Sequence, residues 1–164
     1  MNINYNRQKA VAYARRWALG RNPKFYDYNE IGGDCTNFVS QCVYAGIGVM
    51  NYNTDNGWYY INANNKSPSW TGVNFFYDFI VTNIGAGPYG VDSELENLLP
   101  GDVIQLGDEN NKFYHSLILT AIVRGFRGRR YYICAHSQDA YQRDLFSYRF
   151  ESLRCIHIIG GRDE

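Results

Sequence analysis

The spacing of apolar side chains changes at the segment LLPGD, residues 98–102. Before it apolar residues recur every three or four positions, which predicts helices near residues 4–19, 35–45 and 73–83. After it they alternate with polar residues in five short runs, DVIQL, YHSLILTAIV, RYYICAH, LFSYRF and LRCIHIIG. Helices first and strands second predict an α+β fold, with N-terminal helices packed on a C-terminal antiparallel β-sheet or half-barrel of about five strands.

Length and charge limit the class of protein. At 164 residues we expect a single domain over residues 1–164, with a core that needs neither disulfides nor metal. Lys plus Arg and Asp plus Glu number 16 each, so net charge draws in neither nucleic acid nor an anionic membrane. The N-terminus lacks the apolar stretch of a signal peptide and no run is long enough to span a bilayer. We therefore expect no nucleic-acid partner and no membrane insertion, and leave compartment and oligomeric state open.

The four cysteines form neither a zinc motif nor a disulfide framework. No CxxC spacing is present, and Cys35 and Cys42 would lie two turns apart on one helix, roughly 10 Å, too far to bridge. Cys42, Cys134 and Cys155 each sit in an apolar run, which indicates small core residues. We predict no metal and no cofactor.

Cys35 differs, because it opens an amphipathic helix in GGDCTNFVSQC, residues 32–42. Asp34 is a good N-cap, which places the thiol in the first helical turn. There the exposed backbone N–H groups and the helix dipole favour thiolate over thiol. We expect a reactive cysteine with a pKa below that of a free thiol.

A nucleophilic cysteine needs a base that comes from elsewhere in the chain. His115 stands near the start of one predicted strand and His136 at the end of the next, so a hairpin would place both at one edge of the sheet. His136 could then orient His115, with Asp139 as the alternative partner. We interpret His157, within a C-terminal apolar run, as structural.

The segments DCTNFVSQ, LLPGDVIQL, YHSLILTAIV and YICAHSQDAYQRDL occur in this order over nearly the whole chain. They resemble the putative amidase domain family of bacterial proteins, which is similar to the NlpC/P60 and CHAP papain-like cysteine hydrolases. The resemblance implies a papain-like fold with Cys35 as nucleophile, His115 as general base and His136 in the third position. The longer connection RGFRGRR between the two histidines leaves the choice between His136 and Asp139 open.

The implied reaction is amide hydrolysis through a thioester acyl-enzyme, with an amide or peptide substrate and, by resemblance alone, cell-wall peptide. The backbone N–H of Cys35 is the first expected oxyanion donor. The other candidates for oxyanion or substrate contacts are Tyr28, Asn29, Asp34, Trp58, Tyr59, Tyr60, Trp70 and Asp139. Two alternatives stay open: a thiol acyltransferase or deamidase, and a catalytically idle papain-like module that binds peptide or glycan.

Overall fold

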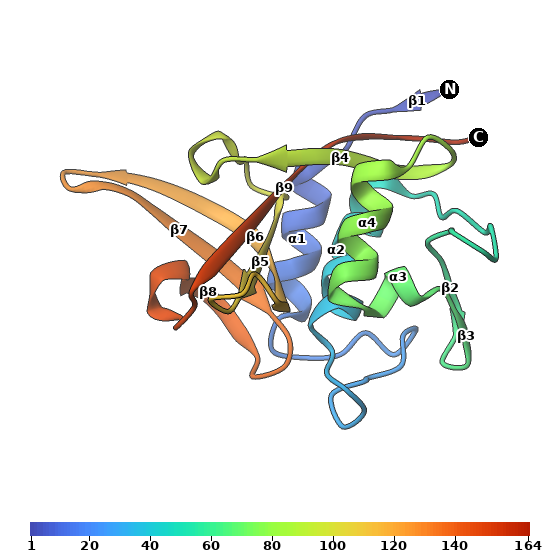
Figure 1. The fold of residues 1–164 in the computed structure, drawn as a ribbon, viewed down its shortest axis with the longest axis horizontal. Helices are drawn as coiled ribbons and strands as arrows, with labels where there is room; N and C mark the ends of the chain where they lie inside the picture. Colours follow the sequence, from blue (N-terminus) through green and yellow to red (C-terminus); the bar gives the residue numbers. More distant parts are fainter.

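A computed structural model describes all residues, 1–164, as helices packed against one curved antiparallel sheet (Figure 1). The helices are α1 (Arg7–Trp17), α2 (Cys35–Ile47), α3 (Pro68–Thr71) and α4 (Val73–Thr82), with single 3₁₀ turns η1 (Leu95–Asn97) and η2 (Leu145–Ser147). The strands are β1 (Asn2–Ile3), β2 (Tyr60–Asn62), β3 (Asn65–Lys66), β4 (Gly87–Ser93), β5 (Val103–Gly107), β6 (Phe113–Gly125), β7 (Gly128–Ala135), β8 (Ala140–Asp144) and β9 (Ser152–Arg162). The mixed α+β class predicted from the sequence is confirmed.

The main sheet has seven strands in the order β1-β9-β5-β6-β7-β8, and β4 also pairs with β9. Strands β5, β6 and β7 form a meander as expected, and β8, which no predicted strand covers, continues it. Strand β9 returns to lie beside β5. Four of the five predicted strands are present, as β5, β6, β7 and β9. The fifth, LFSYRF, is wrong: Asp144 accepts a hydrogen bond from the N–H of Phe146 and turns this segment into η2, directly after β8.

Helix ends follow local capping. Asn6 accepts a hydrogen bond from the N–H of Lys9 and starts α1 later than predicted. The prediction that Cys35 begins α2 is confirmed, and α2 ends at Ile47, before Gly48 in the left-handed conformation with φ 78°. The third predicted helix is present as α4, which ends at Thr82, one residue before the predicted end, and Ile84 beyond it is 91% exposed.

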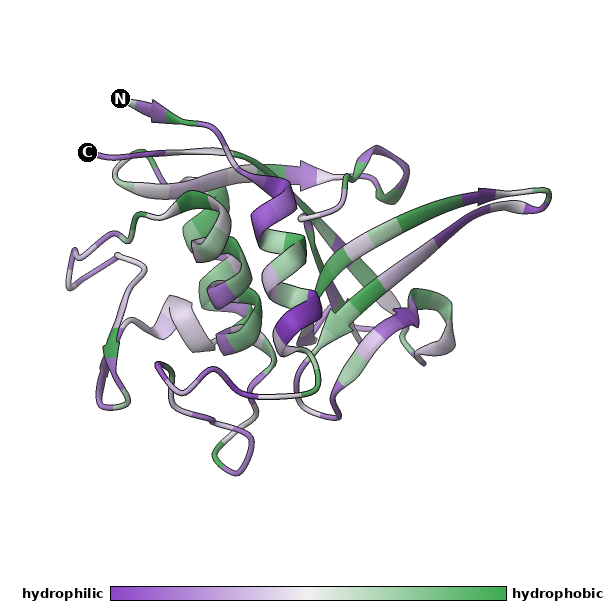
Figure 2. Ribbon diagram, turned by 180° about the vertical axis from the view of Figure 1, so that it is seen from behind, coloured by the Kyte–Doolittle hydropathy of each residue, from purple (hydrophilic) through white to green (hydrophobic).

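Two apolar clusters lie on the two faces of the sheet. The cluster under the helices joins α2 and α4 to the strands through residues such as Phe38, Ile80 and Ile118. The second cluster, on the other face, includes Leu117, Leu119 and Ile133. Figure 2 shows apolar colouring along the helices and central strands and hydrophilic colouring in the surrounding loops. No helix is long and apolar enough to cross a membrane.

Candidate functional site

The Cys35 thiol lies at an opening in the sheet. The last regular pair between β6 and β7 near this end joins Ile118 to Cys134, and β7 stops at Ala135, whereas β6 begins five residues before Ile118. This part of β6 pairs with β5 but has no partner on the β7 side, and the start of α2 lies beside it. The hydroxyls of Thr36 and Ser116 lie 2.9 Å apart and join the two elements.

Hydrogen-bond donors surround the sulfur. The hydroxyl oxygen of Thr36 lies 3.8 Å from Sγ, and the backbones of Ser116 and Thr36 also act to lower the pKa of the thiol. Cys35 is only 8% exposed, however, and this burial raises the pKa of its thiol above the ordinary value despite those donors. The expected lowering of the pKa is therefore wrong for this conformation, because desolvation outweighs the hydrogen bonds.

His115 lies on the opposite face of β6 from α2. Ser116 points toward Thr36, and because successive strand residues point to opposite faces, His115 points the other way. There its ring lies 5.9 Å from that of Tyr148, measured between centroids. Burial, followed by the positive charge of Arg143, lowers the pKa of His115 to about 4, so the imidazole is neutral at physiological pH.

The thiol of Cys35 lies near the peptide that links His115 to Ser116, but the side chains of Cys35 and His115 do not contact each other through a hydrogen bond. Sγ of Cys35 contacts the backbone of Ser116, the residue directly after His115. No hydrogen bond links the thiol to the imidazole, and the nitrogens of the His115 ring have no hydrogen-bond partner. The pairing of Cys35 with His115 therefore stays a prediction.

His136 is placed elsewhere than expected. Its Nδ1 lies 2.5 Å from Oδ2 of Asp34, and its Nε2 lies 2.8 Å from the carbonyl oxygen of Trp17. The ring is buried and stacks on Phe38, with centroids 4.0 Å apart. Since both nitrogens are engaged, His136 does not orient His115 in this structure. Strand alternation explains the difference, because His136 points to the helical face and His115 to the other.

Asp139, the alternative partner of His115, forms a bidentate ion pair with Arg21 instead, at 2.9 and 3.0 Å. Nη1 of the same arginine lies 3.2 Å from Nε2 of His136, and its Nε lies 3.2 Å from Asp27. Asp139 thus belongs to the charged network around His136. It does not contact His115.

Asp34 occupies the N-cap position of α2 without capping it. Its side chain makes no capping bond, accepts instead from the N–H of Tyr28 and the amide of Asn37, both at 2.8 Å, and pairs with His136. The N–H of Cys35 consequently has no acceptor in the structure. This free donor at the start of α2 agrees with the oxyanion role predicted for it.

Tyr28 and Asn29 stand in the loop just upstream of Cys35, from which we expect a second oxyanion donor, and the structure disfavours Tyr28. Its N–H is bonded to Asp34 and its hydroxyl donates to the carbonyl of Ala63 at 2.9 Å. The side chain of Asn29 is exposed and has no hydrogen-bond partner. Asn29 therefore stays a candidate, and Tyr28 is a structural residue.

The aromatic residues predicted to contact substrate lie in the core or pack against it. Trp58 and Trp70 are fully buried and their rings lie 4.6 Å apart, while Tyr59 is 9% exposed. Each indole N–H is already satisfied, by Ser40 for Trp58 and by Asn37 for Trp70. Tyr60 is half-buried and accepts from the N–H of Tyr26. Packing therefore accounts for these side chains.

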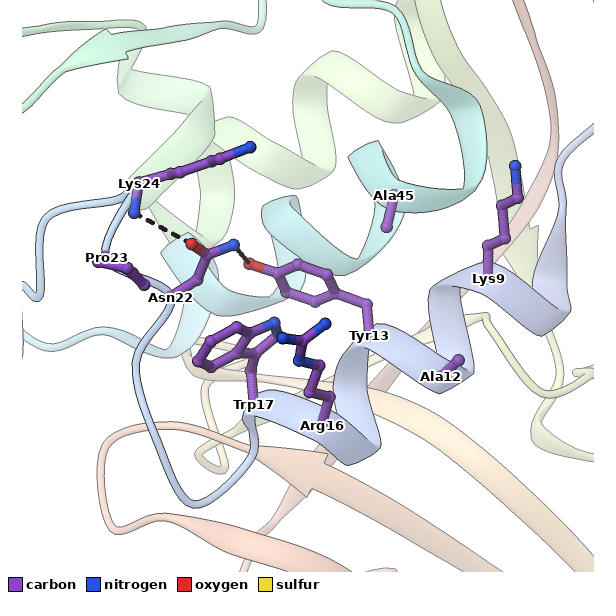
Figure 3. Close-up of a pocket in the computed structure, with 9 residues that line it drawn as sticks. All are labelled: Lys9, Ala12, Tyr13, Arg16, Trp17, Asn22, Pro23, Lys24 and Ala45. Atoms are coloured by element: carbon purple, nitrogen blue, oxygen red, sulfur yellow. Dashed lines mark hydrogen bonds between the residues drawn. The ribbon is translucent and has the colours of Figure 1, made fainter.

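Surface grooves lie away from Cys35 and His115. One groove of about 590 Å³ runs between α1 and the loop that follows it, with Arg16 over the ring of Trp17 and Tyr13 bonded to Asn22 (Figure 3). Its charged residues, Lys9, Arg16 and Lys24, are all basic. A second, of about 460 Å³, is bordered by residues 51–57 and α4. Neither is lined by Cys35 or His115.

The four cysteines are free thiols. No group of three His, Cys, Asp or Glu side chains is arranged to hold a metal ion. His157, interpreted as structural, bonds through Nδ1 to the buried Asp102 at 2.8 Å, and Arg7 binds the other oxygen of this carboxylate at the same distance. The contacts of His157 agree with that interpretation.

Sequence reasoning missed the residues that surround the candidate pair. Thr36 and Ser116 flank the thiol, and Tyr148 and Arg143 flank His115. Thr36 and Ser116 directly follow Cys35 and His115 in the sequence, which is a signal that could have found them. Tyr148 follows η2, within the segment predicted as a strand, and Arg143 lies in β8, which no predicted strand covers.

These features define a class of α+β protein in which a helix-start cysteine lies against a strand of an antiparallel sheet. Residues 4–159 match the family model described as a putative amidase domain, and the chain belongs to that family. A curated relative, the "Uncharacterized protein YhbB" of Bacillus subtilis (strain 168), is 35% identical over 127 residues, which cover 75% of this chain and 39% of the relative. The matched region thus spans about two fifths of that protein. No solved structure matches.

Proposed function

We propose that this chain is a cysteine-dependent amide hydrolase that acts through a thioester acyl-enzyme on peptide amides, with cell-wall peptide as the substrate class. One observation carries the proposal. In a member of an amidase family, the Cys35 thiol at the first turn of α2 lies against the peptide that links His115 to Ser116. Among the three histidines, His115 alone has both ring nitrogens free of hydrogen bonds.

The proposed reaction starts from a neutral thiol and a neutral imidazole, because burial raises the pKa of Cys35 and lowers that of His115. As sulfur attacks the amide carbonyl, the S–H proton passes to His115, which then protonates the leaving amine. The free N–H of Cys35 stabilises the oxyanion. Water, deprotonated by His115, then hydrolyses the thioester and releases a carboxylic acid and free enzyme.

Two movements are required for this reaction. The side chain of His115 must rotate around the edge of β6 to reach Sγ, and the cover over the 8% exposed Cys35 must open to admit substrate. Bond distances in unliganded enzymes are often longer than in the reacting complex. Substrate binding is therefore expected to bring the two groups together.

The test is digestion of purified cell-wall peptides, with mass spectrometry of the products. The wild-type chain should release new amine and acid termini, whereas Cys35→Ala and His115→Ala should lose at least about 100-fold in rate. Cys155→Ala, a thiol in β9, serves as the matched control and should retain activity. Equal cleavage by wild type and Cys35→Ala would refute the proposal.

Trapping separates the alternatives. Rapid acid quench should reveal a mass increase on the Cys35 peptide that equals the acyl group of the substrate. If an added amine is acylated faster than the acid forms, the chain is an acyltransferase. If peptides bind with equal affinity to wild type and Cys35→Ala but are never cleaved, the chain is a binding module.

A further inference from the structure

The distal half of the β6–β7 hairpin extends from the sheet as a two-stranded ribbon (Figure 1). Strand β5 pairs with β6 only from Phe113 to Ile118, and β8 pairs with β7 only from Tyr132 to Ala135. Residues 122–131 therefore pair only with each other. Gly125 pairs with Gly128, which leaves Phe126 and Arg127 as the two residues of the turn.

The tip of this ribbon, defined as residues 123–130, is strongly basic in a chain with no net charge. It contains four of the 16 basic residues and no acidic one. None of the four forms an ion pair. Only one of the four side chains, that of Arg129, donates a hydrogen bond to another residue, to the carbonyl of Glu96. The four residues are Arg124, Arg127, Arg129 and Arg130.

Two features of the tip destabilise the isolated protein. Arg124 and Arg129 lie directly opposite each other across the ribbon, and like charges in this arrangement repel. Phe126 is fully exposed at the apex, and Val123 is 49% exposed beside it. Charges along a free strand edge also prevent aggregation. That role requires neither facing arginines nor an aromatic side chain in water, so both features point to a partner.

We propose that the tip of the ribbon docks on an anionic lipid surface, with Phe126 in the interfacial layer and the arginines on lipid phosphates. The surface supplies what the tip lacks: negative charge between Arg124 and Arg129, and an apolar layer for Phe126. Phe126 lies in the turn at the far end of the ribbon, so it can reach a flat surface without a groove to receive it. Bases of single-stranded nucleic acid stack on aromatic faces as well, so nucleic acid is the competing partner that the test must exclude. The proposal does not depend on the amidase activity.

The experiment measures co-sedimentation of the full chain with vesicles of phosphatidylcholine alone or mixed with phosphatidylglycerol. Binding should require the anionic lipid and weaken as salt rises. Arg124→Gln with Arg127→Gln should lower the partition coefficient about 30-fold, and Phe126→Ser about tenfold. The charge-matched control, Lys9→Gln with Arg16→Gln in the groove of Figure 3, should change it less than about threefold.

Three outcomes would overturn the proposal. The first is no binding to anionic vesicles. The second is an equal loss in the tip variant and the control, since net charge alone would then explain binding. The third is a single-stranded oligonucleotide that binds more tightly than the vesicles in a polarisation assay and loses affinity in Phe126→Ser, because bases would then stack on this ring. Circular dichroism confirms that each variant folds, which is expected because the tip residues are exposed.

Discussion

Oδ2 of Asp34 lies 2.5 Å from Nδ1 of His136, across 102 positions of sequence and with both side chains buried. The contact ties the residue before Cys35 to the residue after β7. The other oxygen of Asp34 accepts from the N–H of Tyr28 and the amide of Asn37. One carboxylate thus fixes the loop before α2, the first turn of α2 and the end of the neighbouring strand, and thereby holds the thiol in place.

Replacing Asp34 by Asn should destabilise the protein strongly. The substitution turns an acceptor oxygen into an N–H₂ group that faces other donors in a buried site. We expect a loss of about 3 kcal/mol in the free energy of unfolding, measured by urea denaturation at pH 7. Asp139→Asn is the matched control, because its partner Arg21 and the carboxylate are both partly exposed. Its effect should stay below about 1 kcal/mol, and equal losses in the two variants would contradict the role of Asp34.

Sequence spacing located the two ends of this network but not the contact itself. Asp34 was expected to cap α2, and His136 to orient His115. The pattern of a strand gives the alternation of its side chains but not the face on which α2 packs. His136 therefore fell on the helical face, where Asp34 is the nearest carboxylate, and His115 on the other.

A second prediction separates packing from recognition at Trp70. The side chain is fully buried, lies 4.6 Å from the ring of Trp58 and donates to Asn37. Trp70→Ala should therefore lower the free energy of unfolding by about 3–5 kcal/mol. The control is Phe126→Ala, a fully exposed aromatic residue, whose effect should lie within about 0.5 kcal/mol of zero. A stable Trp70→Ala protein with weakened substrate binding would instead support the prediction that Trp70 contacts substrate.

The Asn, Tyr, Trp and Ser residues of the segment 46–72 show little periodicity, a pattern typical of a surface loop. The structure gives this segment β2, β3 and α3, and its aromatic residues reach inward to the core. Periodicity detects regular elements that cover a core, but not irregular segments that pack by single large side chains. Strand β4 was missed for a related reason: GPYGVDS contains two glycines and a proline, which are poor strand formers.

The third prediction concerns the reactivity of Cys35 in the free protein. Since burial raises the pKa of the thiol, its alkylation by iodoacetamide at pH 7 should be slower than that of a model thiol, with an inflection at higher pH. Thr36→Val removes a hydroxyl that stabilises thiolate and should slow the reaction further. Rates are followed by peptide mass spectrometry, with the fully buried Cys42 as an unreactive internal reference. An inflection below that of a model thiol would mean that the resting enzyme is more open than this structure.

The last prediction follows from the neutral state of His115. Its pKa is lowered to about 4 by burial and by Arg143, against about 6.5 in an unfolded chain. Between these values the unfolded chain binds more protons, so this contribution to stability is complete above pH 6.5 and is lost as pH falls toward 4. The difference corresponds to about 3 kcal/mol. His115→Asn should remove this part of the decline in urea stability between pH 7 and pH 4.5.

The same pKa predicts the acid limb of activity. If neutral His115 accepts the thiol proton, kcat/KM for an amide substrate, which reports the free enzyme, should rise through about pH 4 and level off above it. Arg143→Gln removes the positive charge beside the ring and should shift this limb to higher pH, whereas Arg149→Gln should leave it in place. Because desolvation is the larger cause of the low pKa, Arg143→Gln should raise the pKa of His115 by only part of the difference between about 4 and 6.5. An acid limb near pH 6.5 in the unmodified chain would mean that His115 is exposed to water when it acts. The conformation of β6 around His115 in the active enzyme would then differ from the one in this structure.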